Sequence, residues 1–159
     1  MPYGPPPPMQ TMPQPSGALS ASAALRVECS REGFARARSF TRDTLRFWSL
    51  DHRCDDTTLV ITELAANAAT HAAPGTAGTT GAPAAPEIRL GFLLDPTHLL
   101  VTVSDPDDHP PVYAPTGSAL AEHGRGLGIV DALSEEWGWT PCTPAGKTVW
   151  ARLPACPPI

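Results

Sequence analysis

Residues Asp55 to Ala73 read DDTTLVITELAANAATHAA, and this stretch decides the fold. Acidic residues at its start favour a helix N-terminus, and Pro74 with Gly75 ends it, so the pattern predicts one long helix. Projection at about 100° per residue gathers an apolar sector along this helix. The sector comprises Val60, Ile61, Leu64, Ala65, Ala68 and Ala72. We expect this sector to be the buried face of the helix.

A stripe of polar residues borders the apolar sector. Glu63, Asn67 and His71 follow one another at intervals of four residues, with Thr70 between the last two. Polar groups at the border of a buried face cost free energy to desolvate unless something pairs with them. The stripe either caps a neighbouring loop or belongs to a binding site, and the helix alone favours neither interpretation.

Length, charge and cysteine content limit the class of protein. A chain of 159 residues supports one domain with a real core. Its net charge of -5, without a run of basic residues, disfavours nucleic acid and membrane surfaces as partners. Four scattered cysteines argue against a zinc site and suit a reducing compartment. No segment resembles a signal peptide or a membrane helix, so we expect a cytoplasmic protein. The single lysine, Lys147, has no predicted role.

The chain divides into a proline-rich tail over residues 1–22, a domain over 23–154 and a short C-terminal tail over 155–159. Within the domain, weak alternation over residues 24–28 predicts a short edge strand. A helical pattern then runs from Ser30, a suitable N-cap, to about residue 50.

Strand patterns fill most of the second half of the chain. Residues 87–94 and 98–104 predict a hairpin with a tight turn at 95–97, and residues 136–139 and 147–153 predict a second strand pair. The resulting fold class is α+β: a two-layer sandwich with helices on one face of a mixed, mostly antiparallel sheet.

A glycine-rich stretch, GRGLG at residues 124–128, precedes a predicted helix over 129–133. A glycine turn that opens a helix can bind phosphate, because the backbone N–H groups are accessible and the helix dipole attracts anions. The motif alone is weak, since such turns are common. It matches neither the dinucleotide fingerprint nor the P-loop.

Three further positions could complete a nucleotide site. The Asn67 carbonyl oxygen suits a Mg²⁺ ion already held by phosphates. Glu63, one turn earlier, could accept a proton from an attacking hydroxyl. Asp105 follows an apolar strand and could accept a hydrogen bond from the amino group of a base.

Four motifs in this order resemble those of the GHKL superfamily, the histidine-kinase-like ATPases with the Bergerat ATP-binding fold. They are ELAANAATHA, VSDPDDHPP, GRGLGIVDAL and GKTVWARLP. Over residues 24–153 the chain looks most like the short bacterial anti-sigma-factor serine kinases. The resemblance implies ATP and Mg²⁺ as cofactors, and a sigma factor with a small antagonist protein as partners. It leaves a homodimer open.

The same resemblance implies a role for each matching residue. Glu63 would be the general base, Asn67 the Mg²⁺ ligand, and Asp105 the reader of the adenine amino group. Gly126 and Gly128 would let a phosphate lid pack on the nucleotide, Arg125 could reach the terminal phosphate, and Thr148 would contact the adenine side through water. His71 has either a structural role or a nucleotide contact.

One motif departs from the family pattern. The family's first glycine box reads D-x-G-x-G, whereas residues 105–109 read DPDDH and lack both glycines. This change predicts weaker nucleotide binding. Two functions therefore stay open: an ATP-dependent serine/threonine kinase, and a non-catalytic module of the same fold that sequesters a partner. A two-component sensor is disfavoured, because no phospho-accepting helical hairpin precedes the domain.

Overall fold

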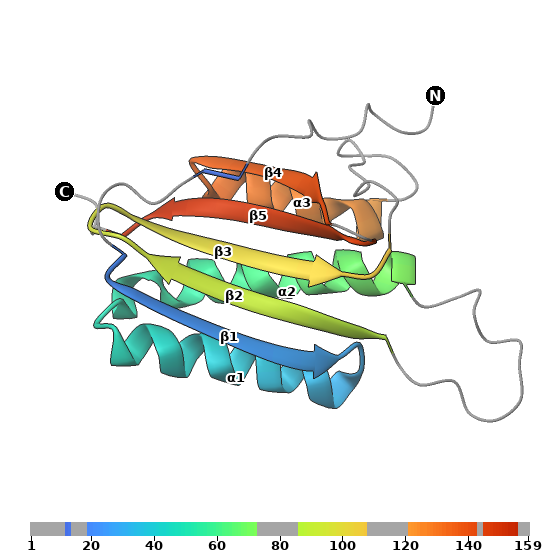
Figure 1. Cartoon of the computed structure of the whole chain (residues 1–159), viewed down its shortest axis with the longest axis horizontal. Coiled ribbons are helices and arrows are strands. Elements are labelled where there is room, and N and C mark those ends of the chain that lie inside the picture. The colour runs from blue at the N-terminus through green and yellow to red at the C-terminus, as the bar shows by residue number, and fades with distance from the viewer. Residues whose placement is uncertain (1–11, 14–18, 73–85, 108–120, 143–144, 156–159) are drawn as a thin grey trace, which may run out of the picture.

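The computed structural model describes residues 12–13, 19–72, 86–107, 121–142 and 145–155 (Figure 1). Within these ranges, the side chains of residues 69–72 and 121–126 lie outside the description. These described residues form five strands, three α-helices and one 3-10 turn. In chain order they are β1 (Ala21–Glu28), α1 (Arg31–Phe47), η1 (Asp51–Arg53), α2 (Cys54–Ala72), β2 (Glu87–Leu94), β3 (His98–Asp105), α3 (Ala121–Leu133), β4 (Glu136–Pro141) and β5 (Lys147–Pro154).

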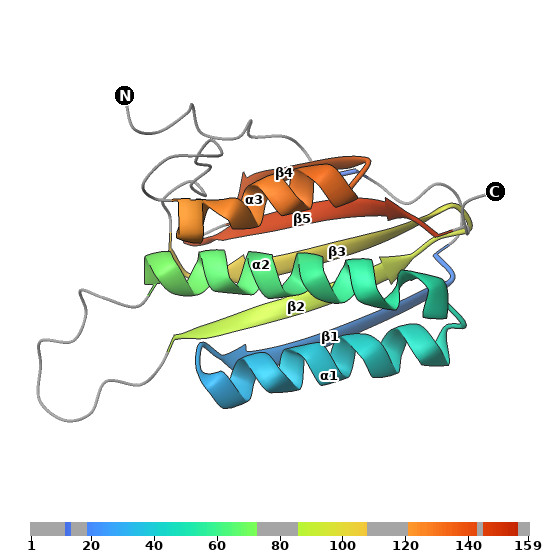
Figure 2. The ribbon, with the colours of Figure 1, turned by 180° about the vertical axis from the view of Figure 1, so that it is seen from behind.

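The strands form a single sheet in the order β1-β2-β3-β5-β4. All four pairs between described strands are antiparallel, so the expectation of a mixed sheet was wrong in that detail. The three α-helices lie side by side over one face of the sheet, as Figure 2 shows. We call this the helix-covered face and the opposite one the outer face. The predicted α+β two-layer architecture is confirmed.

Local signals set both ends of α1. The Ser30 side chain accepts a hydrogen bond from the Gly33 N–H at 3.0 Å, which confirms the predicted N-cap. At the other end, Ser49 adopts a left-handed φ of 59°. The Leu50 N–H then donates to the Leu45 carbonyl, and the Ser49 N–H to Arg46, in the bonding pattern of a Schellman motif. Helix α1 therefore ends at Phe47, slightly earlier than predicted.

Helix α2 occupies the middle of the helical layer and contacts α1, α3 and β3. The apolar sector predicted from its sequence is buried wherever its side chains are described. Its buried members are Val60, Ile61, Leu64, Ala65 and Ala68. The side chain of Ala72, the sixth predicted member, lies outside the described set. Because every neighbour of α2 contributes apolar surface, the hydrophobic effect anchors this helix from several sides.

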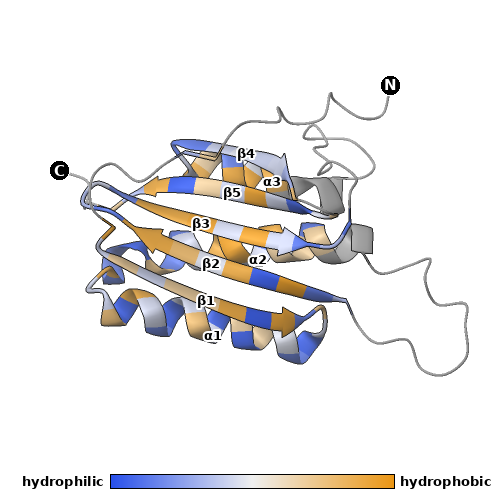
Figure 3. Ribbon diagram, in the orientation of Figure 1, coloured by the Kyte–Doolittle hydropathy of each residue, from blue (hydrophilic) through white to orange (hydrophobic). Residues whose placement is uncertain are grey.

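The strands contribute alternate residues to the core. Figure 3 shows hydrophilic and hydrophobic residues alternating along residues 87–90 of β2 and 25–28 of β1. Phe92, Leu99, Val101, Val103 and Val149 are almost completely buried. The predicted hairpin of β2 and β3 is confirmed, and β1 pairs with β2 as the predicted edge strand, although it begins three residues earlier than expected.

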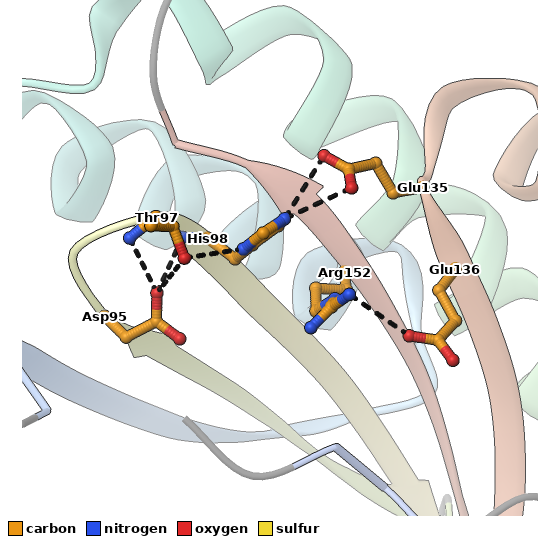
Figure 4. A network of polar contacts seen from close by, with 6 residues as sticks. All are labelled: Asp95, Thr97, His98, Glu135, Glu136 and Arg152. Carbon is orange, nitrogen blue, oxygen red and sulfur yellow. Dashed lines mark hydrogen bonds and ion pairs between the residues drawn. The ribbon is translucent and has the colours of Figure 1, made fainter. Parts of the chain in front are cut away.

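The turn between β2 and β3 is closed by a carboxylate. Asp95 Oδ1 accepts hydrogen bonds from the Thr97 N–H at 2.8 Å, the Thr97 hydroxyl at 3.1 Å and the His98 N–H at 2.7 Å (Figure 4). The His98 Nε2–H in turn donates to Glu135 at 3.2 Å. These contacts tie the start of β3 to the segment between α3 and β4.

Two predicted boundaries shift in the structure. The GRGLG stretch is not a turn before a helix: α3 begins at Ala121, so residues 124–128 lie inside it. At the C-terminal end, Ala155 is buried and its N–H donates to the Thr97 carbonyl at 2.9 Å, so ordered chain extends beyond β5. In the described part of the chain, no helix combines the length and the apolar character needed to span a bilayer.

Candidate functional site

The predicted site residues come from elements that meet at one end of the domain. The C-terminal end of α2, the C-terminal end of β3, the beginning of α3 and the beginning of β5 all lie at the right-hand end in Figure 1 and at the left-hand end in Figure 2. Helix α2 contacts α3, β3 and β5 there. Segments far apart in sequence are therefore brought together where the motifs predicted a site.

Glu63 and Asn67 project from α2 one turn apart, on the same side of the helix. Asn67 is buried, with 7% of its surface exposed. Glu63 is half-buried at the border of this face. Burial raises the pKa of the Glu63 carboxyl above its usual value, because desolvation disfavours the charged form. A carboxylate that holds its proton more tightly is a better general base.

Asp105 lies at the last position of β3, buried beside Lys147. The Lys147 Nζ donates to Asp105 Oδ1 at 3.1 Å and to the Asp107 carbonyl oxygen at 3.2 Å, and it lies 3.8 Å from Asp107 Oδ2. The Asp107 N–H also donates to Asp105 Oδ1 at 2.8 Å. The exposed fractions of the Lys147 and Asp105 side chains are only 0% and 1%.

Two opposing influences act on the pKa of Asp105. Desolvation by burial raises it, while the charge and hydrogen bond of Lys147 and the N–H of Asp107 lower it. The balance leaves the pKa of Asp105 above its usual value, with burial as the largest cause. The second carboxylate oxygen, Oδ2, is also buried and accepts no hydrogen bond from the described residues.

The register of β3 and β5 brings this ion pair together. Asp105 stands directly opposite Lys147, and Val103 opposite Val149. Because alternate residues share a face, Asp105 and Lys147 point to the helix-covered face with these two valines. Gly146 precedes Lys147 with a φ of +95°, and a Cβ atom there would collide with the Asp105 carbonyl oxygen. A glycine is needed at this position for β5 to approach β3 so closely.

Thr148, expected on the adenine side, stands opposite Ser104 in the same register. It therefore points to the outer face, away from Asp105. Its hydroxyl is hydrogen-bonded to the Ser104 hydroxyl at 2.7 Å and lies 3.2 Å from Cys142 Sγ. The structure thus brings Lys147, and not Thr148, to the side of Asp105.

The glycines of the third predicted motif, residues 124–128, lie in the first eight residues of α3. A Cβ atom built on Gly128 would meet no described atom within 4 Å, so packing gives no reason for a glycine at this position. A glycine inside a helix costs about 1 kcal/mol relative to alanine. Space beside α3 is consistent with a ligand that approaches its backbone. The Arg125 side chain and the surroundings of Gly126 lie outside the described set, as does the side chain of His71.

Lys147 is the site residue that sequence reasoning missed. One signal was available: the single lysine of the chain opens a mostly apolar closing strand, directly after a glycine. A charged residue within such a strand needs a partner when it is buried, and Asp105 ends the neighbouring strand. Only the strand register, however, decides whether these two residues stand opposite each other.

The described residues fit Mg²⁺ and a triphosphate better than they fit an adenine base. Asn67 supplies a buried amide, Glu63 a nearby carboxylate, and α3 a glycine, Gly128, with open space beside it. No group of three or more His, Cys, Asp or Glu residues in the described ranges could hold a metal ion. The Asn67 amide oxygen is a neutral ligand of the kind that can complete the shell of a cation held by phosphate oxygens. At Asp105, where an adenine base was expected to bind, Lys147 already forms an ion pair with the carboxylate.

Comparison with known proteins agrees with this arrangement of elements. The family model described as the histidine kinase-like ATPase domain matches residues 28–153, from the end of β1 to the last residue but one of β5. This chain belongs to the histidine kinase-like ATPase family. The predicted membership of the GHKL superfamily is thereby confirmed. A comparison with curated protein sequences finds no significant match.

A solved structure shares the fold of this ATPase-family chain. It is the crystal structure of the RsbU and RsbW domains of Rv1364c from Mycobacterium tuberculosis, with a TM-score of 0.56 and 17% sequence identity. The alignment covers 84% of this chain and 32% of the solved chain, so this chain spans about a third of that protein's crystallised length. At this level of identity, the likeness establishes the fold alone.

Proposed function

We propose that this histidine kinase-like ATPase domain is a regulatory protein kinase of the anti-sigma-factor type. It would transfer the γ-phosphoryl group of ATP to a serine or threonine of a small antagonist protein, and would bind a sigma factor when the antagonist is phosphorylated. The observation that carries this proposal is the Glu63–Asn67 pair on α2, in which a carboxylate of raised pKa lies one turn from a buried amide.

Each residue of the pair has a distinct role in this proposal. Asn67 would contribute its amide oxygen to a Mg²⁺ ion, which when bound neutralises charge on the phosphates. Glu63 would accept the proton of the serine hydroxyl as its oxygen attacks the γ-phosphorus and ADP departs. Phosphoryl transfer depends mainly on positioning and charge stabilisation, so few protein groups are needed. The half-buried position of Glu63 holds the base at the border of the core while leaving it partly accessible.

The surroundings of Asp105 favour a second function. The Lys147 ammonium already pairs with the Asp105 carboxylate, and the two glycines of the first glycine box are missing. Both features disfavour tight nucleotide binding. The alternative is a non-catalytic module that captures its partner by surface contacts and does not turn over ATP.

The substitution Glu63→Gln separates the two functions. It keeps the size and a hydrogen-bonding head group but removes the base. If the chain is a kinase, nucleotide binding should stay close to normal while phosphoryl transfer falls by roughly 10²-fold or more, the usual scale for loss of a general base. The measurement is transfer of labelled γ-phosphate to a partner captured from the native cell at saturating Mg²⁺-ATP.

Glu136→Gln provides a matched control, because Glu136 lies in β4 at the other end of β5 and pairs with Arg152 there. This change should leave transfer unaltered. Equal, non-zero transfer by the parent and Glu63→Gln would remove Glu63 from the mechanism. No transfer by the parent, with partner capture intact, would decide for the sequestering module.

A further inference from the structure

We propose that Lys147 prevents recognition of the nucleobase at this site by pairing with the carboxylate that the base would have to reach. The ligand class is then a nucleoside triphosphate bound through its phosphates, with little preference for adenine over guanine. This inference rests on the proposed nucleotide site and deepens it, since it assigns a role to a residue outside the expected set.

The first argument is accessibility. Asp105 Oδ1 already accepts the Lys147 ammonium at 3.1 Å and the Asp107 N–H at 2.8 Å. Oδ2 is buried from solvent. With 1% of the Asp105 side chain exposed, neither oxygen can be reached by a ligand unless the surrounding structure moves. An amino group on a base therefore finds no available acceptor at this position.

The second argument is a comparison of free energies. To reach Asp105 Oδ1, a base would have to displace Lys147 and leave an ammonium ion unpaired in the protein interior. The Lys147 side chain is completely buried, so it cannot turn to water in exchange. Breaking a buried ion pair costs more than one hydrogen bond to a carboxylate returns. The pair should therefore stay closed when the nucleotide binds.

The third argument concerns the chemistry of an opened site. An aspartate beside a lysine offers an acceptor next to a donor. Adenine matches them with its amino donor and N1 acceptor, and guanine matches them with its N1–H donor and O6 acceptor. Even if the base reached both side chains, the two purines would be bound almost equally well.

The test compares the affinities of the parent for Mg²⁺-ATP, Mg²⁺-GTP and Mg²⁺-tripolyphosphate by calorimetry. We expect dissociation constants for ATP and GTP within about 3-fold of each other, because less than one hydrogen bond distinguishes them. An ATP preference of more than about 10-fold, which is the scale of one such bond, would overturn the inference while leaving the proposed kinase intact.

Two variants sharpen the test. Lys147→Thr removes the ammonium, and Asp105→Asn combined with Lys147→Thr also avoids leaving a buried charge unpaired. A variant that folds, as judged by cooperative thermal unfolding, should bind ATP and GTP about 10-fold more tightly relative to tripolyphosphate than the parent does, because the freed oxygen can accept the adenine amino group or the guanine N1–H. Arg152→Thr serves as the control, since it removes a cation from the same strand at the far end, and it should leave this relative affinity unchanged.

The outcomes separate this inference from the proposed function. A parent that binds no triphosphate would overturn the proposed kinase. In that case the inference survives only if a Lys147 variant gains ATP binding, and any other result overturns it as well. Folded variants whose affinity for ATP relative to tripolyphosphate equals that of the parent would show that Lys147 does not block contact with the base.

Discussion

The paired strands β3 and β5 have polar contacts at both ends, and the two contacts differ in burial far more than in distance. At one end, Lys147 and Asp105 are 3.1 Å apart with 0% and 1% of their side chains exposed. At the other end, His98 lies 3.2 Å from Glu135 with 19% and 48% exposed. Figure 4 shows this second end, which forms a polar network around the turn at Asp95. Contact distance alone therefore does not indicate how much each pair contributes to the free energy of unfolding.

The surroundings explain why the two ends should behave differently. Coulombic attraction and desolvation both grow as the effective dielectric constant falls, so a buried pair is costly to form and costly to break. A solvent-exposed pair gains little and loses little, because water competes for both partners. We therefore expect the lysine end to be sensitive to single substitutions and the histidine end to be tolerant of them.

The largest loss of free energy of unfolding is expected for Lys147→Met, which removes the ammonium from the buried pair. The change keeps the apolar length of the side chain but leaves the Asp105 carboxylate buried without its ammonium partner. The free energy of unfolding should fall by about 3–5 kcal/mol, the usual cost of removing one member of a buried pair. Urea unfolding followed by tryptophan fluorescence measures it.

The matched control for that loss replaces both partners. Lys147→Met combined with Asp105→Leu removes both buried charges, and such replacements are often neutral or stabilising. The double variant should therefore be more stable than Lys147→Met alone. If it is not, the loss in the single variant comes from packing and not from the unpaired carboxylate.

An intermediate effect is expected for Asp95→Ala at the opposite end. This carboxylate is buried and accepts three hydrogen bonds that close the turn, so its removal leaves the Thr97 and His98 N–H groups without that acceptor. The free energy of unfolding should fall by roughly 2 kcal/mol. Asp95→Asn keeps an oxygen in place and should cost less. A loss at Asp95 as large as that at Lys147 would contradict the ranking of the two ends.

The smallest change in free energy of unfolding is expected for Glu135→Gln, which removes the carboxylate from the exposed contact with His98. The carboxylate is about half exposed, so its contact with His98 competes with water. The free energy of unfolding should change by less than about 1 kcal/mol. Added salt at about 1 M should shrink the difference between variant and parent further, because it screens exposed charges. A loss of free energy of unfolding that persists at high salt would show that this contact does not act through exposed, screenable charges.

Local patterns were enough to predict most of the elements. The 3.6-residue period of residues 55–73 identified α2 and its buried face, and the Ser30 cap identified the start of α1. The β2–β3 hairpin followed from strand patterns on either side of a short turn. These predictions succeeded because each depends on residues that are close in sequence. The GRGLG stretch was misjudged because glycine lowers helix propensity without excluding a helix once the surrounding segment packs.

The sequence predicted the relative placement of the candidate residues within one helix, but it could not predict their placement where two strands meet. Glu63 and Asn67 share a side of one helix, so their proximity follows from helical geometry whatever the rest of the chain does. Asp105 and Lys147 are 42 residues apart, and no local pattern relates them. A shift of one residue in the β3–β5 register would have brought Thr148, and not Lys147, opposite Asp105.

The sequence by itself determined the family, the order of the elements and the Glu63–Asn67 pair, because motifs and periodicity are properties of neighbouring residues. Tertiary structure alone decided that the single lysine is buried against Asp105, which face of the sheet Thr148 occupies, and which charged pair water can reach. These depend on strand register and burial, and both are set by the packing of the whole sheet against its helices. The same aspartate could bind a ligand or an internal ammonium ion, and only the partner that folding brings to it decides between the two.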